Sequence, residues 1–230
     1  PSGVAYGSEL TKPTGGAVYF PASNSYLSIP TSDDFSFGTG DFSIECYFIL
    51  YQLGAQQHIY EGRKSGNTDR ALIYVKTDNK VYFYGNAADR ISSEVLVQNV
   101  WYHVAVCRVS AVTTLYLNGV SQGTYSDTIN YVKPASYVYI ASNDSPNGSL
   151  FKGFISNMRV LKGSSAYSSA FAPPITPLTN ITNTKLLCCQ GSNAANYAVS
   201  PGTISVQAGV YASAFNPFDT DIDTVMGKPT

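Results

Sequence analysis

The chain has 230 residues, a formal net charge of −1, a hydrophobic share of 44% and a charged share of only 13%. This length suits two small domains or one large β sandwich, and the hydrophobic residues are ample for one core. A near-neutral chain without a basic cluster argues against a nucleic-acid partner, and no apolar run approaches the ~20 residues needed for membrane insertion. The 18 tyrosines, 19 glycines and 12 prolines favour many strands joined by tight turns.

Runs of alternating apolar and polar residues, rich in β-branched and aromatic side chains, predict short strands along most of the chain. Residues 1–14 are small, polar and proline-containing, so we expect an N-terminal arm or linker there. The predicted strands cover residues 17–20, 25–29, 41–51, 58–61, 71–75, 80–84, 91–97, 101–109, 113–117, 120–124, 136–141, 151–161 and 185–189. Strands at intervals of roughly 8–15 residues with almost no helix predict a two-sheet antiparallel sandwich.

The stretch 101–124 (WYHVAVCRVSAVTTLYLNGVSQGT) predicts three consecutive antiparallel strands. Asn118-Gly119 is the dipeptide that most readily takes positive φ at both central positions of a two-residue hairpin. We expect this meander at the centre of the sandwich, with Trp101 in the core. The strands 41–51 and 151–161 are then expected beside it.

Glu45 is a carboxylate in the middle of the apolar strand DFSIECYFILY, where an unpaired charge would be costly. Arg159 is the expected partner, with His103 or Arg108 as alternatives. Glu45, Arg159 and His103 are therefore predicted to form a structural polar network.

Four cysteines, Cys46, Cys107, Cys188 and Cys189, show no zinc-ligand spacing. We interpret them as buried free thiols that pack as small hydrophobic residues. Free thiols point to assembly in a reducing compartment, which we expect to be a host cytoplasm.

After the last long strand the chain becomes polar. The segment 163–171 (GSSAYSSAF) is expected to form one short helical turn. From residue 191 to residue 230 the sequence is rich in Asn, Ala and Gly, with weak strand signals at 197–199 and 204–207. We expect this C-terminal extension to wrap the sandwich or to contact a neighbouring subunit, with Phe215 and Phe218 as its anchors.

Several motifs, in order, resemble laminin-G-like, concanavalin-A-like jelly-roll domains. They are GGAVYFPASNSYLSIPTSDDFSFGTGDFSIECYF, VWYHVAVCR, LYLNGV and FKGFISNMRVLKG, although Tyr47 stands where many members carry Trp. The resemblance implies an all-β, two-sheet antiparallel jelly-roll sandwich over residues 15–190. The extended N- and C-terminal segments, 1–14 and 191–230, would lie outside this domain.

A narrower pattern lies towards the C-terminus. RVLKGSSAYSSAFAPPITPLTNITNTKLLCCQ, followed by VQAGVYASAFNPF, resembles the closing segment of laminin-G-like domains in tailed-bacteriophage virion proteins. This resemblance implies a non-enzymatic structural or adhesion protein of a virion: a tail fibre, an adhesin or a capsid decoration. Its expected partners are other virion proteins, further copies of the chain and a glycan of the host surface. The alternative is a carbohydrate-binding lectin domain.

A polysaccharide hydrolase is the third functional hypothesis. Such enzymes of this fold place two carboxylates close together on one strand face. The sequence has no Glu-x-Asp-x-Glu cluster, and Glu45 is the only acid on its strand face. We therefore expect no enzyme and assign no catalytic residue.

Ligand contacts are expected in loops and on aromatic rings. The polar loop Ser142–Ser149 (SNDSPNGS) supplies Asn143, Asp144 and Asn147 as candidates. The tyrosines that could act as aromatic platforms are Tyr26, Tyr60, Tyr84, Tyr125, Tyr131 and Tyr137. Of these, Tyr125 and Tyr131 are the leading candidates.

Calcium is the only cofactor for which the sequence offers ligands. Asp33 and Asp34 lie in a turn-rich loop that is expected at the rim of the sandwich. Calcium requires six or more oxygen ligands, which two adjacent carboxylates do not supply. Acidic residues are also ordinary turn formers, so these two are weak metal candidates.

Overall fold

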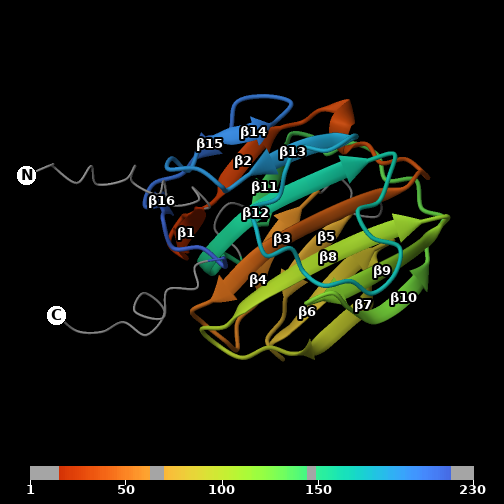
Figure 1. The fold of residues 1–230 in the computed structure, drawn as a ribbon, viewed down its shortest axis with the longest axis horizontal. Coiled ribbons are helices and arrows are strands. Elements are labelled where there is room, and N and C mark those ends of the chain that lie inside the picture. Colours follow the sequence, from red (N-terminus) through yellow and green to blue (C-terminus); the bar gives the residue numbers. More distant parts are fainter. Residues whose placement is uncertain (1–15, 63–69, 144–148, 219–230) are drawn as a thin grey trace, which may run out of the picture.

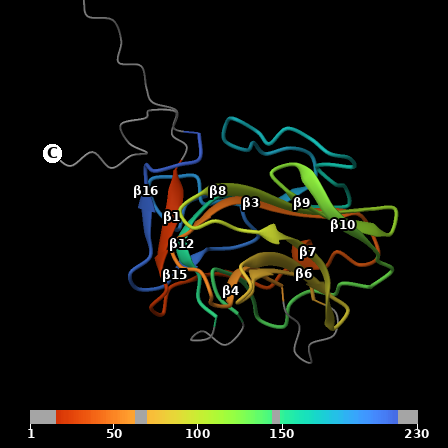
Figure 2. The same ribbon diagram turned by 90° about the horizontal axis from the view of Figure 1, so that it is seen from below.

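A computed structural model describes residues 16–62, 70–143 and 149–218. Within these ranges the chain forms two antiparallel sheets stacked face to face, with β8, β3 and β12 in one layer and β4 and β6 in the other (Figures 1 and 2). The only helical element in the described residues is a short 3-10 turn, η1 (Asp33–Phe35). The predicted all-β, two-sheet sandwich is therefore confirmed.

The larger sheet contains nine strands of the described residues. From one edge it runs β10 (Val120–Ser126), β9 (Val112–Leu117), β8 (Trp101–Val109), β3 (Phe42–Leu50), β12 (Lys152–Lys162), β1 (Ala17–Pro21) and β16 (Tyr211–Ser213). Two further strands extend it, because β13 (Thr184–Cys188) pairs with β12, and β14 (Tyr197–Val199) pairs with β13. β1 and β13 share one edge of the long strand β12, whose other edge pairs with β3.

The smaller sheet contains seven strands within the described ranges. Its order is β15 (Ser205–Val206), β2 (Leu27–Pro30), β11 (Tyr137–Ile140), β4 (Gln57–Glu61), β5 (Leu72–Val75), β6 (Lys80–Gly85) and β7 (Ala88–Val95). Each strand predicted from the sequence corresponds to an observed strand, with boundaries that differ by a few residues. The short strand β16 was not predicted.

The meander β8–β9–β10 forms as the sequence predicts. Asn118 and Gly119 have φ of 49° and 77°, and the preceding turn uses Ser110 and Ala111 at 49° and 62°. Both turns therefore take positive φ at two successive residues, which matches the right-handed twist of the strands they join. β3 lies between β8 and β12, so the three long strands are neighbours, as expected.

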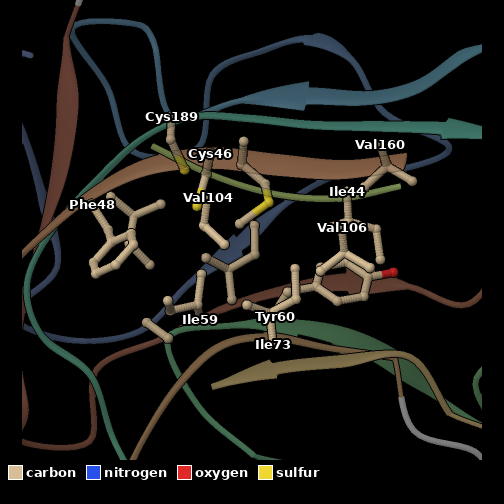
Figure 3. Packing of buried hydrophobic residues seen from close by; sticks show 14 of the residues in the cluster. Ile44, Cys46, Phe48, Ile59, Tyr60, Ile73, Val104, Val106, Val160 and Cys189 are labelled. Carbon is tan, nitrogen blue, oxygen red and sulfur yellow. The ribbon is translucent and has the colours of Figure 1, made fainter. Parts of the chain in front are cut away.

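The core lies between the two sheets. Ile44, Cys46 and Phe48 of β3 point towards Ile59 of β4 and Ile73 of β5, and all five are buried (Figure 3). Burial of an aliphatic or aromatic side chain contributes roughly 1.5–3 kcal/mol. The four cysteines are also buried and free, which confirms the interpretation of their sequence positions.

The prediction that Trp101 fills this core is wrong. Along β8 the residues Tyr102 and Val104 belong to the main core, so Trp101 points to the opposite, outer face of the sheet. There it is half-buried against Phe215, with the ring centroids 5.4 Å apart. Because this part of the outer face is also covered, both faces of β8 are apolar, and alternation alone does not show which one is inside.

The predicted helical turn at 163–171 does not form either. This segment runs without helix or strand from the end of β12 across the outside of the larger sheet (Figure 2). Tyr167 and Phe171 stack on each other there, at a centroid distance of 3.4 Å, and pack against Ala105 and Tyr116. We call residues 163–178 the covering segment. Its tertiary packing, rather than local propensity, sets its path.

The C-terminal extension forms strands within the described range. β14 and β15 correspond to its two weak strand signals, while β16 pairs with β1. The predicted arm 1–14 lies outside the described residues. No helix in the described part of the chain is long and apolar enough to cross a membrane.

Gly153 provides a test of the packing between β3 and β12. Its φ is +143°, and a Cβ at this position would collide with the carbonyl oxygen of Ile49. Gly153→Ala should therefore lower the free energy of unfolding by about 3 kcal/mol, measured by urea denaturation. Gly40→Ala is the control, because a Cβ there would meet its nearest neighbour, the Phe37 carbonyl oxygen, at an ordinary 3.5 Å. Equal stability losses in the two variants would contradict the predicted collision.

Candidate functional site

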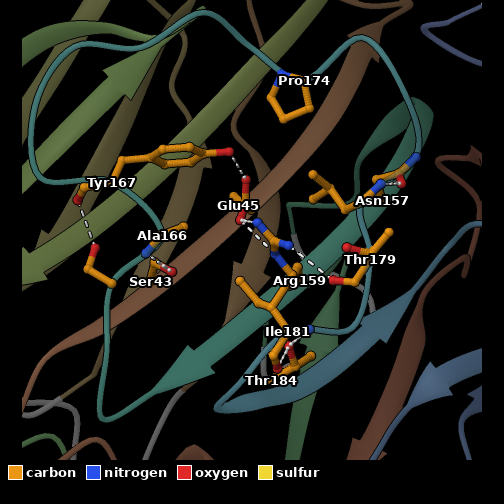
Figure 4. A network of polar contacts seen from close by, with 12 residues as sticks. Ser43, Glu45, Asn157, Arg159, Ala166, Tyr167, Pro174, Thr179, Ile181 and Thr184 are labelled. Atoms are coloured by element: carbon orange, nitrogen blue, oxygen red, sulfur yellow. Dashed lines mark hydrogen bonds and ion pairs between the residues drawn. The ribbon is translucent and has the colours of Figure 1, made fainter.

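The outer face of the nine-stranded sheet carries a buried polar network around Glu45. Arg159 donates to Glu45 Oε1 from Nε at 2.8 Å and from Nη2 at 2.6 Å. The other carboxylate oxygen, Oε2, accepts from the Tyr167 hydroxyl at 2.9 Å and lies 3.2 Å from His103 Nε2. The structure thus brings together the three residues of the predicted network and adds Tyr167 from the covering segment. Figure 4 shows Glu45 between Arg159 and Tyr167.

These partners keep Glu45 ionised although its side chain is fully buried. Burial alone would raise the pKa of this carboxyl. The hydrogen bond with His103 and the charge of Arg159 outweigh that effect and hold the pKa below its ordinary value. Burial and the nearby Glu45 charge also raise the pKa of the Tyr167 hydroxyl, which stays protonated and donates.

The covering segment closes this face over the network. The Tyr47 hydroxyl donates to the carbonyl of Pro174, and the backbone N–H of Ala166 donates to Ser43 Oγ at 3.2 Å. Arg159 Nη1 also donates to the carbonyl of Thr179 at 3.1 Å. A carboxylate with its partners already in place and no exposed surface has a structural role rather than a ligand-binding one.

The outer face of the seven-stranded sheet has a different composition. Strand register places Tyr139, Glu61, Leu72, Tyr84 and Asp89 in one row across β11, β4, β5, β6 and β7. Directly paired residues of antiparallel strands point to the same side of a sheet. Their neighbours along each strand point into the core, so this row lies on the outside.

A second row runs parallel to the first. His58, Tyr74 and Tyr82 are paired across β4, β5 and β6, and Tyr26 and Tyr137 flank Tyr139 at the other end. Tyr137 is 43% exposed, and Tyr26, Tyr82, Tyr84 and Tyr139 are half-buried. We call this surface the tyrosine face and define it by Tyr26, Tyr74, Tyr82, Tyr84, Tyr137 and Tyr139.

Charged groups lie between these rings. The guanidinium of Arg70 stacks 4.3 Å from the ring centroid of Tyr84, and Lys76 Nζ lies 4.9 Å from that of Tyr82. Lys76 also pairs with Asp89 at 3.0 Å, and Asp89 accepts from the Tyr74 hydroxyl. Cations fixed over aromatic rings by such contacts lose little further freedom when a ligand binds.

The centre of the tyrosine face contains a buried polar cluster. His58 Nδ1 lies 3.3 Å from Glu61 Oε2, and Arg70 Nη1 lies 3.9 Å from the same oxygen. Gln56 Nε2 lies 3.2 Å from His58 Nε2 and donates to Ser149 Oγ at 3.2 Å. The polar side chains on β4 are therefore linked to the end of the predicted loop Ser142–Ser149.

That loop begins and ends beside the tyrosine face. Asn143 follows β11, and the backbone N–H of His58 donates to the carbonyl of Ser149 at 3.0 Å. Asp144 and Asn147, the other two loop candidates, lie outside the described residues. Of the predicted ligand contacts, Asn143 is thus the one that the structure places near this face.

Tyr125 and Tyr131 do not contribute to this surface. Tyr131 is only 1% exposed, and its hydroxyl donates to Asp127 at 3.0 Å, so its ring is part of the core. Tyr125 packs against the core cluster, with the guanidinium of Arg90 4.7 Å from its ring centroid. Tyr60 is buried too. The prediction that Tyr131 is an exposed aromatic platform is therefore wrong.

Four residues of this surface were not predicted from the sequence: Tyr74, Tyr82, Tyr139 and Arg70. The alternation within 71–75 and 80–84 contained the signal, because it sets Tyr74 with Leu72 and Tyr82 with Tyr84 on the face opposite the aliphatic residues. The sequence does not give the register between those two strands, which pairs Tyr74 with Tyr82.

The weak calcium candidates are engaged with lysines. Asp33 Oδ1 lies 3.2 Å from Lys133 Nζ, and Asp34 Oδ1 lies 3.4 Å from Lys185 Nζ. Among the described residues no group of three or more His, Cys, Asp or Glu side chains could hold a metal ion. Asp33 and Asp34 are thus paired with lysines and, within the described residues, are not gathered with a third acidic side chain.

The rings of Phe215 and Phe218 contact their own domain. The centroid of Phe215 lies 5.1 Å from that of Phe154, and Phe218 packs edge-to-face on Tyr47 at 5.1 Å. Both rings are half-buried against the nine-stranded sheet. The described part of the C-terminal extension therefore packs on the sandwich of its own chain.

Comparison with known proteins identifies the family. A family model described as the concanavalin A-like lectin/glucanases superfamily matches residues 21–166, well over half of the chain. The chain belongs to this superfamily. A search of curated proteins found no significant match.

Solved structures share the fold at low sequence identity. A "putative carbohydrate binding protein" from Bacteroides ovatus superposes with a TM-score of 0.68 at 15% identity, covering 89% of this chain and 62% of that one. A heptameric SAP-like pentraxin from Limulus polyphemus gives 0.60 at 16% identity, covering 90% and 98%. Domain 4 of a GH43 arabinanase from Geobacillus stearothermophilus, solved with arabinotriose, gives 0.51 at 16% identity, covering 65% and 72%. Identities this low support the fold alone.

The Glu45 network predicts how stability depends on pH. The folded-state pKa of Glu45 is lowered, so its contribution is complete at neutral pH and is lost as pH falls below about 4.5, when the unfolded chain takes up the proton first. Glu45→Gln should cost about 3 kcal/mol at pH 7, because Arg159 is left without its counter-charge. The difference from the wild type should shrink at pH 3, measured by denaturant titration.

A deficit for Glu45→Gln that is the same at both pH values would contradict this assignment. Glu94→Gln is the control, because Glu94 is exposed near the end of β7. Its substitution should change stability by less than about 1 kcal/mol at either pH.

Proposed function

We propose that this domain is a non-catalytic carbohydrate-binding module and that the saccharide binds on the tyrosine face. The observation that supports this most directly is the row of half-exposed tyrosines with Arg70 and Lys76 held between them. Two of the structural relatives are named for carbohydrate binding or were solved with a saccharide, which agrees with the proposal.

The chemistry of this face suits a sugar. A pyranose or furanose ring presents an apolar C–H surface that packs on an aromatic ring, while its hydroxyls need planar, directional hydrogen-bond partners. Tyr82, Tyr84 and Tyr137 supply accessible rings of this kind. Lys76, whose side chain is 39% exposed beside the ring of Tyr82, supplies an ammonium donor for a sugar hydroxyl.

The opposite face argues against hydrolysis by Glu45. A general acid of a glycosidase needs a raised pKa and access to the glycosidic oxygen. The pKa of Glu45 is lowered, and its side chain has no exposed surface. A non-enzymatic role therefore accounts better for this carboxylate.

Tyr84→Ala tests the proposed binding face. Removing the ring that carries Arg70 should weaken saccharide binding about tenfold, because a central aromatic contact usually dominates such an interface. A glycan array should first identify the ligand, and isothermal titration should then compare the variant with the wild type. Tyr211→Ala is the matched control, since Tyr211 is 53% exposed on β16 of the other sheet.

Two results would contradict this proposal. The array could show no bound glycan, in the presence or absence of calcium. Alternatively, Tyr84→Ala could bind an identified glycan as tightly as Tyr211→Ala.

A virion role is the second candidate function. We propose that the domain serves as a structural or adhesion module of a bacteriophage particle, alongside other virion proteins and further copies of itself. The observation that favours it is the sequence resemblance over residues 163–218, the part of the chain that forms the covering segment and β13 to β16. Mass spectrometry of phage particles purified from an infected culture should detect the chain. A monomer that stays in the lysate and is absent from the particles would contradict this role.

A further inference from the structure

We propose that the chain has a second binding site, for a neutral saccharide, in a groove between the end of the covering segment and β14. The groove has a volume of about 620 Å³. It is lined by Pro177, Leu178, Thr179, Cys188, Gln190, Gly191, Ser192, Asn196, Tyr197 and Ala198. Ligand sites in proteins commonly span about 300–1,000 Å³, so an oligosaccharide segment fits this volume.

A buried amide, that of Asn157, fixes two of the residues that line the groove. Asn157 is fully buried and has a φ of 56°, where the pairing of β12 with β3 is interrupted. Its Oδ1 accepts from the backbone N–H of Leu178 at 2.7 Å and from Gln190 Nε2 at 2.6 Å. Gln190 Nε2 also donates to the carbonyl of Leu178 at 2.7 Å. Leu178 and Gln190, which both line the groove, are therefore fixed before any ligand arrives.

The polar groups that face a ligand remain available. Thr179, Ser192, Asn196 and Tyr197 are all exposed. Within the described part of the chain, the side chains of these four residues form no hydrogen bond. Two hydroxyls, one amide and the phenol of Tyr197, a residue that is 45% exposed, thus surround the groove. Such a set offers donors and acceptors for sugar hydroxyls and a ring for the sugar's C–H surface.

The composition of the groove indicates an uncharged ligand. None of the ten lining residues is Asp, Glu, Lys or Arg. A charged saccharide would lose hydration here without gaining a counter-charge. The tyrosine face, in contrast, carries Arg70, Lys76 and Asp89. The two sites therefore differ in the chemistry they select.

The groove is separate from the tyrosine face in both sequence and structure. Its lining residues, 177–198, follow the segment 21–166 that matches the superfamily. They border the nine-stranded sheet through β13 and β14, whereas the tyrosine face lies on the seven-stranded sheet (Figure 1). The proposal for the groove therefore does not depend on saccharide binding at the tyrosine face.

The test is a nuclear magnetic resonance titration of the ¹⁵N-labelled full chain with cellotetraose, xylotetraose, maltotetraose and arabinotriose. At least one of these neutral probes should shift the backbone amide signals of residues 190–198. Tyr197→Ala should weaken that binding about tenfold, and Asn196→Ala should weaken it measurably. Tyr211→Ala and Tyr84→Ala are the controls, and both should bind at the groove like the wild type.

Three other outcomes would each contradict the proposed second site. Shifts confined to the strands of the tyrosine face would leave the proposed function in place and exclude the second site. Unchanged affinity in both Tyr197→Ala and Asn196→Ala, with both variants folded, would place the ligand elsewhere. No shift with any probe would also overturn it, and glycan-array binding that depends on Tyr84 would then still support the tyrosine face.

Discussion

The ionised carboxylate of Glu45 is the constraint around which the larger sheet is organised. It lies on the central strand β3, so its partners have to come from β8, from β12 and from whatever chain crosses above it. Tyr167 supplies the last of these contacts and fixes the covering segment. Arg159 then joins Glu45 to the carbonyl of Thr179, which borders the groove. Through Arg159, the buried charge of Glu45 is thus connected to the groove, whose residue Thr179 lies 20 residues after Arg159 in the chain.

The two outer faces of the sandwich illustrate different uses of polar residues. On the nine-stranded sheet both carboxylate oxygens of Glu45 have partners within the chain. These contacts order the covering segment and leave no room for a ligand at Glu45. On the seven-stranded sheet the rings of Tyr82, Tyr84 and Tyr137 and the side chain of Lys76 keep exposed surface. The outer face of the nine-stranded sheet is therefore stabilised by the covering segment, whereas the tyrosine face is hydrated and can bind a ligand by releasing water.

The sequence predicted the parts of this fold that depend on local pattern. The long strands, the Asn118-Gly119 hairpin and the partners of Glu45 follow from alternation, turn chemistry and the cost of an unpaired charge. Trp101 was misplaced because both faces of β8 are covered, and the 163–171 segment because stacking of Tyr167 on Phe171 overrides local preference. The tyrosine face and the groove depend on strand register and on a bulge at Asn157, which no local window contains.

The pairing of β1 with β16 makes the last described strands part of the domain rather than an appendage. β1 would otherwise be an edge strand with a row of unpaired backbone groups, and such edges recruit strands from other molecules. The same extension places Phe215 over Trp101 and Phe154. A chain shortened to residues 15–190 would expose both the edge and the aromatic surface. Such a fragment would also lose the core residues Ala194 and Ile204, and it should be prone to self-association.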